Sequence, residues 1–164
     1  MLGRTYDREN CSAARTLEIV GERWSLLIIR NAMFAGSTRF TEFQRMLGVA
    51  PNILSNRLDR FVDAGLMRTQ PVTDDHETRE YVLTGKGVDL QPVIIALTEW
   101  GDQWAAPQGP PIIYEHDGCG GRIHQHLSCE NCDAAPAPGQ VTARPGPGMP
   151  TGATCPEGLL PVVE

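Results

Sequence analysis

Residues 39–64 read RFTEFQRMLGVAPNILSNRLDRFVDA, and this stretch decides the fold. Its first part, 39–47, places two phenylalanines and a leucine at positions i, i+3 and i+7, the spacing of one helix face. Gly48 interrupts the pattern, and Pro51 stands at the start of a second helical stretch, 51–64, where proline is well tolerated. Two short amphipathic helices joined by a glycine-containing turn predict a helix-turn-helix.

The segments on either side extend this motif. Upstream, residues 12–19 and 22–33 have helical patterns, and the second is apolar nearly all round, as expected of a buried central helix. Downstream, residues 66–72 and 79–83 predict two short strands, with a polar loop at 73–78 between them. The order of elements predicts a mainly α fold with a small β-hairpin, a winged helix-turn-helix.

A last helix is predicted from about Gly85 to Trp104, with a kink at Pro92. An apolar stripe runs along it at steps of three or four residues. The members of the stripe are Leu90, Val93, Leu97, Trp100 and Trp104. Because the rest of the domain already has a core, the stripe predicts a homodimer of two-fold symmetry. Packing of the stripe against its own domain is the alternative.

Composition changes after this helix. Twelve of the 14 basic residues precede residue 107, whereas most of the 13 prolines follow residue 106. We expect a winged-helix and dimerisation domain over 1–106, a linker with cysteine-containing turns over 107–133, and a Pro/Gly-rich flexible tail over 134–164.

The overall composition limits the classes of function. The chain has 164 residues, 41% of them hydrophobic, and a net charge of −6, which is ordinary for a globular domain with an appendage. This charge excludes a protein that coats nucleic acid by charge alone, but it allows a site-specific binder. No apolar run is long enough to span a bilayer, and the N-terminus, MLGRTYDREN, is too polar for a signal peptide. We therefore expect a cytoplasmic protein with no membrane partner.

The helix predicted over 51–64 has two faces when its residues are set about 100° apart. One face is apolar, and the other carries amides, a hydroxyl and arginines, which hydrogen-bond to base edges in the major groove of DNA. The candidate base contacts are Asn52, Ser55, Asn56, Arg57 and Arg60. The candidate phosphate or groove contacts are Arg39, Thr41 and Arg45 on the preceding helix and Arg68 and Arg79 on the hairpin. A solvated surface helix is the alternative; the order of elements favours DNA.

Several segments, taken in order, carry a family resemblance. They are Cys11, VGERWSLLIIR at 20–30, RFTEF at 39–43, LSNRL at 54–58, AGL at 64–66, EYVLT at 80–84 and LTEWG at 97–101. Over roughly residues 8–104 the chain resembles the HxlR-type winged-helix transcriptional regulators, a branch related to the MarR-like proteins. The resemblance implies a homodimeric regulator, often a repressor, that binds a double-stranded DNA operator. It also implies that 51–64 is the recognition helix and that the last helix dimerises.

Two features depart from the family pattern. Ala50 stands where the family usually has a serine or similar residue that caps the recognition helix. The hairpin segment TDDHETREY is acidic and lacks the family's proline-rich turn. Residues 39–80 hold six basic and seven acidic side chains, so DNA affinity must come from their arrangement.

A lone cysteine, Cys11, precedes the first predicted helix, with Arg8 and Arg15 within one turn. A helix N-terminus and nearby arginines favour the thiolate, and the resemblance implies a sensor of oxidants, quinones or aldehydes at this position. A buried, inert thiol is the alternative. An unknown small-molecule effector between the last helix and the rest of the domain is a further hypothesis. Its candidate walls are Trp24, Trp100 and Trp104.

Four residues in the 107–133 segment have metal-ligand spacing. They form two pairs, His116–Cys119 and Cys129–Cys132. Two such pairs are a common frame for tetrahedral structural zinc, and this Pro/Gly-rich stretch has too little apolar area to order itself without metal. The pattern resembles a degenerate zinc ribbon. His124 or His126 could replace His116, and a vestigial site without metal is the alternative.

The sequence offers no motif for an enzyme. It contains no paired carboxylates, Gly-rich phosphate loop or nucleophile–base pair at a recognisable spacing. We therefore expect a protein that is not an enzyme. The alternative to a DNA-binding regulator is a ligand-sensing or protein-interaction module with a zinc-ribbon-like tail.

Overall fold

The structure is a computed structural model that describes residues 11–72, 75–149 and 152. The chain divides into two compact units, Met1–Ile123 and His124–Glu164. The division falls inside the predicted 107–133 segment, so residues 107–123 belong with the first unit. Among the described helices, none has both the length and the apolar character needed to cross a membrane.

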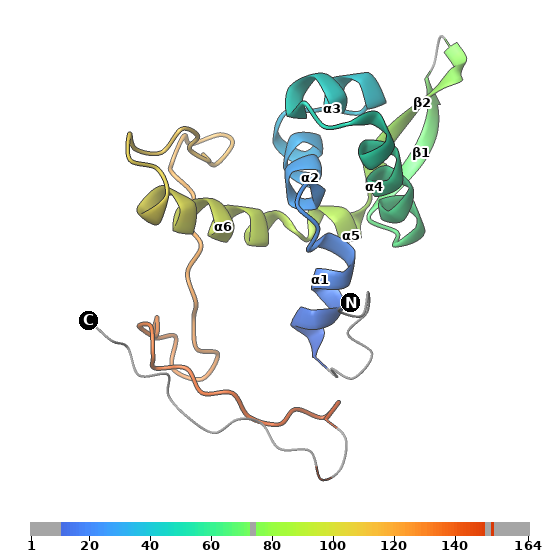
Figure 1. Ribbon diagram of the computed structural model, residues 1–164. Coiled ribbons are helices and arrows are strands. Elements are labelled where there is room, and N and C mark those ends of the chain that lie inside the picture. The colour runs from blue at the N-terminus through green and yellow to red at the C-terminus, as the bar shows by residue number, and fades with distance from the viewer. Residues whose placement is uncertain (1–10, 73–74, 150–151, 153–164) are drawn as a thin grey trace. The chain divides into compact units, whose positions relative to one another are not determined.

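The first unit contains helices and strands in the predicted order (Figure 1). They are α1 (Ser12–Val20), α2 (Ser25–Phe34), α3 (Phe40–Leu47), α4 (Pro51–Asp63), β1 (Met67–Val72), β2 (Asp75–Leu83), α5 (Gly85–Val88) and α6 (Gln91–Trp104). The fold is therefore mainly α with a small β-hairpin, a winged helix-turn-helix. α2 begins three residues later than predicted, because the chain first turns after Gly21, whose N–H bonds to the Leu17 carbonyl at 2.8 Å.

One apolar cluster holds the first unit together. α2 contacts α1, α3, α6 and β2, which explains why its sequence is apolar nearly all round. The side chains that are fully buried in this cluster are Ile28 and Ile29 of α2, Phe43 of α3, and Leu54, Leu58 and Phe61 of α4. Burial of each such side chain contributes roughly 1.5–3 kcal/mol, so the core fixes the position of α4 relative to α2 and α3.

The wing is a two-stranded antiparallel sheet whose register runs from Met67 opposite Leu83 to Pro71 opposite Arg79. After Pro71 the register shifts, and Val72 pairs with Asp75. The prediction of a loop is therefore wrong for residues 75–78, which belong to β2. A bulge at the register shift lets the strand pairing continue although apolar and polar residues do not alternate there. Residues 73–74 lie outside the described residues.

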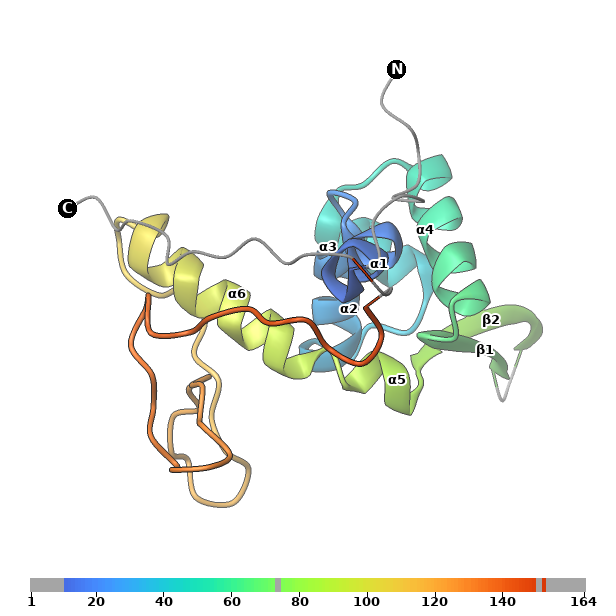
Figure 2. The same cartoon turned by 90° about the horizontal axis from the view of Figure 1, so that it is seen from below.

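The single helix predicted over 85–104 is two helices, α5 and α6. Pro92 lies in the first turn of α6, where its missing N–H sacrifices no helical hydrogen bond. The chain therefore does not form one long helix kinked at Pro92; it forms two helices, and the helical structure is interrupted between Val88 and Gln91. α5 packs closely on the base of the hairpin at Gly87, where a Cβ would overlap the Leu66 carbonyl oxygen. Seen from below, α6 extends away from the group formed by α1 to α4 (Figure 2).

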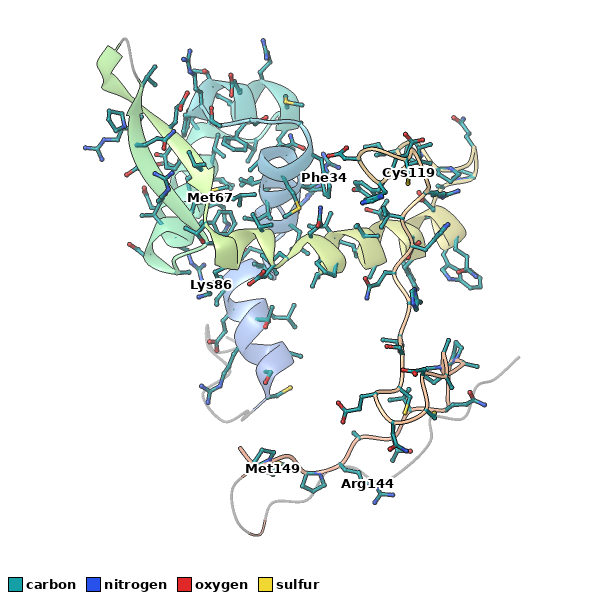
Figure 3. The ribbon with its side chains drawn as sticks, turned by 180° about the vertical axis from the view of Figure 1, so that it is seen from behind. Phe34, Met67, Lys86, Cys119, Arg144 and Met149 are labelled. Atoms are coloured by element: carbon teal, nitrogen blue, oxygen red, sulfur yellow. The ribbon has the colours of Figure 1, made fainter. Side chains whose placement is uncertain are left out.

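After α6 the chain turns at residues 107–109 and returns over the first unit as a short hairpin, residues 112–123, which we call the return arm. The Tyr114 ring lies 4.5 Å from the Phe34 ring, and its hydroxyl is 3.4 Å from the Thr98 hydroxyl. The Ile123 N–H donates to the Tyr114 carbonyl at 2.8 Å. Figure 3 shows Phe34 on the side of α2 that faces this arm.

The described part of the second unit, residues 124–149 and 152, contains turns but no helix or strand. It includes a turn in which the Asp133 N–H donates to the Cys129 carbonyl and the Cys129 N–H donates to the Ala134 carbonyl. Residues 150–151 and 153–164, which include Cys155, lie outside the described residues. The flexibility of the 134–164 tail stays a prediction.

Candidate nucleic-acid interface

Gly48 forms the turn between α3 and α4. Its φ of 63° lies in the left-handed region, which glycine adopts without the Cβ penalty, and its N–H donates to the Gln44 carbonyl at 2.9 Å. Ala50 precedes α4 with no side-chain capping bond, as the sequence predicted, and Pro51 is the first helical residue. The turn brings α4 against α3 in helix-turn-helix arrangement.

The two predicted faces of α4 are present. Leu54, Leu58 and Phe61 have no exposed surface, whereas Asn52, Ser55 and Asn56 are exposed on the opposite side within the first two turns. Ser55 is 3.5 Å from the Asp59 carboxylate one turn later. The amide side chains are positioned to donate to and accept from a base edge, the chemistry that reads adenine.

Arg57 does not lie with these exposed residues. Its Nη2 is 2.9 Å from Glu22 Oε2, its side chain is only 14% exposed, and its Nε is buried without a hydrogen-bond partner in the described structure. The ion pair braces α4 against the turn between α1 and α2. This corrects the expectation that Arg57 faces the bases, because the ion pair with Glu22 holds the long side chain against the turn between α1 and α2.

Arg60 is exposed but also turns toward α1. Its Nη2 donates to the Glu18 carbonyl oxygen at 2.8 Å. A guanidinium has five N–H donors, so others remain for a phosphate. The contact of Arg60 with DNA stays a prediction.

The start of α3 is held by Glu42. Its carboxylate accepts from the backbone N–H groups of Thr38 at 2.9 Å and Arg39 at 3.0 Å. The pKa of Glu42 is lowered, first by the bond from Arg39, then by the bond from Thr38, and further by the charges of Arg39 and Arg45, against desolvation that raises it. The predicted phosphate contacts Arg39, Thr41 and Arg45 are all exposed on this helix or at its start.

Replacing Glu42 by alanine should lower the free energy of unfolding by about 1 kcal/mol at pH 7, the usual effect of losing a helix N-terminal bond. Because the folded-state pKa is lowered, this contribution is present above the unfolded-state pKa and is lost as pH falls through the folded-state pKa. Urea unfolding at pH 7 and pH 3 measures it, with Glu130→Ala as the control. An equal deficit at both pH values would contradict a role for the ionised carboxylate.

The wing is joined to the start of α3. The Tyr81 N–H donates to the Thr38 carbonyl at 2.7 Å, and Arg39 Nε lies 3.6 Å from Glu80 Oε1. Burial, and to a lesser extent the nearby Asp59 carboxylate, raises the pKa of Tyr81. Sequence reasoning missed these links because they connect residues about 40 positions apart, and periodicity reports only local pairs.

The two predicted wing contacts, Arg68 and Arg79, are exposed on β1 and β2. Beside them, Gln70 donates to the Glu80 carboxylate at 3.2 Å. The exposed amides of α4, the basic side chains of α3 and these two arginines thus belong to one rigidly connected group of elements.

Cys11 is the N-cap residue of α1 and is exposed, and its side chain makes no capping hydrogen bond. The alternative of a buried thiol is therefore wrong. Arg8 lies outside the described residues, and reactivity of Cys11 stays a prediction.

The predicted zinc ligands form two tight turns, one in each unit. In the first unit His116 Nδ1 is 3.3 Å from Cys119 Sγ, which also accepts from the Gly121 N–H at 3.4 Å. In the second unit, Cys129 accepts hydrogen bonds from the backbone N–H groups of Asn131 and Cys132 and from the Cys132 thiol, and these lower the pKa of Cys129. Among the described residues, no group of three or more His, Cys, Asp or Glu side chains is placed to hold a metal ion.

Comparison with known proteins gives a family. The model of the HxlR-like helix-turn-helix family matches residues 19–109, from the end of α1 to the turn after α6. A Mycobacterium tuberculosis protein named as an HTH-type transcriptional regulator is 43% identical over 142 residues, which are 86% of this chain and 89% of that protein. YvaP of Bacillus subtilis, also named as an HTH-type transcriptional regulator, is 29% identical over 94 residues, 57% of this chain and 86% of its own.

Solved structures agree with the fold. The crystal structure of PA1607, a candidate transcription factor, superposes with a TM-score of 0.75 at 33% identity and covers 85% of this chain and 97% of its own. The redox regulator HypR in its oxidised form gives a TM-score of 0.51 at 26% identity, and the match covers 57% of this chain and 96% of HypR.

Proposed function

Since this chain belongs to the HxlR-like helix-turn-helix family and is a transcriptional regulator of the helix-turn-helix type, we propose that it is a cytoplasmic homodimeric repressor that reads a double-stranded DNA operator through α4. The observation that carries the proposal is the exposed face formed by Asn52, Ser55 and Asn56. Opposite this face the helix is anchored in the core by side chains with no exposed surface. A helix held in this way can enter a major groove without losing its packing.

Selection of DNA fragments from the source genome by the purified chain tests the proposal. We expect recovered fragments to share a two-fold symmetric sequence, with half-sites about 10 base pairs apart, because a dimer places its two recognition helices about 34 Å apart. Recovery of fragments without a common sequence would contradict sequence-specific binding. Transcription in vitro from a promoter that contains the site then separates repression from activation.

The apolar stripe of α6 supports the homodimer. Val93, Leu97, Trp100 and Trp104 are 45%, 50%, 62% and 67% exposed, which favours a partner over packing of these four against their own domain, the alternative from the sequence. Leu90 is different: it precedes α6 and packs against the core cluster. The proposed interface therefore consists of the other four side chains, while Ile94 and Ile95 of the same helix are buried.

We propose further that Cys11 senses oxidants or electrophiles. Support comes from its exposure at the N-terminus of α1, where the helix dipole favours a thiolate, and from the similarity to HypR, which is named as a redox regulator. Mild peroxide should modify Cys11 and change operator affinity at least fivefold, and Cys11→Ser should abolish the change. Mass spectrometry and fluorescence anisotropy measure the two effects. Modified Cys11 with unchanged affinity would contradict sensing.

We also propose that Cys129 and Cys132 bind zinc, with His116 and Cys119 as further ligands. Support comes from the two turns: each brings its pair of side chains together, and backbone N–H groups point at the sulfur of Cys129, an environment that stabilises a thiolate ligand. Metal analysis of untagged protein should find about one zinc per chain. Cys129→Ser with Cys132→Ser should lose it, and the control Cys11→Ser should keep it. A metal-free wild-type chain would contradict the site.

A further inference from the structure

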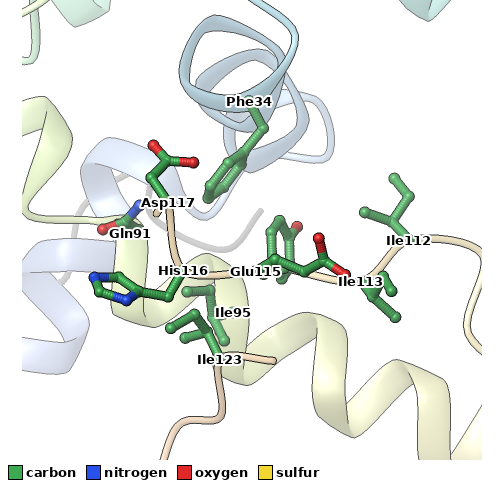
Figure 4. Close-up of a pocket in the computed structure, with 10 residues that line it drawn as sticks. Phe34, Gln91, Ile95, Ile112, Ile113, Glu115, His116, Asp117 and Ile123 are labelled. Atoms are coloured by element: carbon green, nitrogen blue, oxygen red, sulfur yellow. The ribbon is translucent and has the colours of Figure 1, made fainter. Parts of the chain in front are cut away.

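A cavity of about 600 Å³ lies in the first unit between the end of α2, α6 and the return arm (Figure 4). None of the residues assigned above to DNA contact or to the dimer interface lines it, and of the proposed zinc ligands only His116 does. The apolar part of its wall comes from Phe34, Ile95, Ile112, Ile113, Tyr114 and Ile123. The Phe34 and Tyr114 rings, 4.5 Å apart and tilted by 43°, form an aromatic corner. The volume lies within the range of about 300–1,000 Å³ that is typical of small-molecule sites.

The polar part of this wall has a distinct charge. It consists of Gln91 at the start of α6 and the consecutive residues Glu115, His116 and Asp117 of the return arm. The wall thus carries two carboxylates and no lysine or arginine. Arg122, which pairs with Glu115 in the backbone bridge of the arm, is not among the residues that line the cavity. The wall therefore offers a ligand both apolar and aromatic surface and negative charge.

A second cavity of about 200 Å³ shares Phe34, Ile112 and Tyr114 with the first. Its wall includes Met46 of α3, whose sulfur accepts a hydrogen bond from the Ser37 hydroxyl at 3.2 Å. It also includes Arg30, whose guanidinium donates two hydrogen bonds to the Asn31 side-chain oxygen, at 3.1 and 2.9 Å. Through these shared residues, the aromatic corner lies next to the first helix of the helix-turn-helix.

We propose that the larger cavity binds a hydrophobic organic cation, an aromatic or aryl-substituted amine or onium ion, as the effector of this regulator. Aromatic faces attract cations, the carboxylates of Glu115 and Asp117 neutralise the charge, and the isoleucines accept the apolar body. Occupation of the aromatic corner changes DNA binding through Met46 and α3. The proposal that the cavity binds a cation depends only on the residues that line the cavity. The proposal that binding changes DNA affinity rests on the proposed function.

This site replaces the pocket walls expected from the sequence. The cavity lies beside the last helix, as the hypothesis held, but Trp24, Trp100 and Trp104 do not line it. Trp24 packs against the core cluster, and the other two are exposed. The residues that line it instead come largely from the return arm, whose packing the proline-rich sequence before it gave no reason to expect.

A pair of probes of matched shape and opposite charge tests the ligand class. Isothermal titration calorimetry of the full chain should show binding of tetraphenylphosphonium and at least tenfold weaker binding of tetraphenylborate. The double variant Glu115→Gln, Asp117→Asn should bind the cation about tenfold more weakly, because two partly exposed ion pairs are lost. The control Glu130→Gln, Asp89→Asn makes the same change of charge at two residues that do not line the cavity and should bind like the wild type. The smaller cation benzyltrimethylammonium serves if the phosphonium is too bulky.

Binding of neither cation, equal binding of the borate, or equal affinity of the two double variants for the cation would overturn the assignment of the cavity. The effect on DNA is measured separately, as operator affinity with and without saturating cation. A change of at least threefold that the cavity variant loses supports the effector role, and no change overturns it. If the chain selects no DNA sequence at all, the proposed function fails while the calorimetry still decides whether the cavity binds cations.

Discussion

The double variant Asn52→Ala, Asn56→Ala should bind the selected operator at least about thirtyfold more weakly than the wild-type chain. Each amide that makes two hydrogen bonds to a base contributes about 1–3 kcal/mol of discrimination, and about 1.4 kcal/mol corresponds to a factor of ten. Both side chains are exposed on α4, so their removal leaves the core unchanged. Fluorescence anisotropy with labelled operator and with a scrambled duplex measures the two affinities.

The affinity for the scrambled duplex should change little, because phosphate contacts, which carry no sequence information, remain. Arg39→Ala provides the contrast: it should weaken binding to both duplexes alike and reduce the dependence of affinity on salt. Gln108→Ala with Asn131→Ala removes two exposed amides elsewhere and is the matched control. Unchanged operator affinity of the α4 variant, with an unchanged melting temperature, would show that α4 is not the reading helix.

Replacing both Leu97 and Trp100 by glutamate should convert the dimer to a monomer and lower operator affinity at least a hundredfold. The two side chains are 50% and 62% exposed in the single chain, so four carboxylates would meet at the proposed two-fold interface, where burial without partners is strongly unfavourable. A monomer holds only one half-site and loses the second recognition helix. Sedimentation equilibrium and anisotropy measure the two effects.

The matched control is Leu127→Glu with Val141→Glu, which places the same charges on two exposed apolar residues of the second unit. It should remain dimeric and bind the operator normally. A monomeric wild-type chain would contradict the homodimer itself. A dimeric Leu97→Glu, Trp100→Glu variant would show that a different surface forms the interface.

Local pattern was sufficient for most of the winged helix. The repeat of apolar residues, Gly48 and Pro51 located α3 and α4 to within one residue, because each of these signals acts within one or two turns of the chain. The same signals failed after Leu83. Pro92 was expected to kink one helix, but Leu90 packs on the core and α6 starts afresh behind it, a choice made by tertiary packing.

In the candidate nucleic-acid interface too, local pattern predicted some side-chain positions and tertiary contacts set others. Exposure of Asn52, Ser55 and Asn56 followed from helical geometry, because Leu54 and Leu58 on the other face had to be buried. Arg57 lies at the boundary between the two faces of α4, so helical geometry alone does not predict whether its side chain is exposed. The ion pair with Glu22 at 2.9 Å determines where the side chain lies. A partner 35 positions away leaves no trace in the periodicity of either segment.

By itself the sequence determined the order and type of the elements, the exposed polar face of α4 and the apolar stripe of α6, because each depends on residues within a few turns of one helix. Only the tertiary structure decided which arginine is held inward, which part of the stripe is exposed, and that the return arm packs against Phe34 and borders a cavity. These features arise from contacts between distant segments, whose free energy depends on three-dimensional proximity and only weakly on separation along the chain.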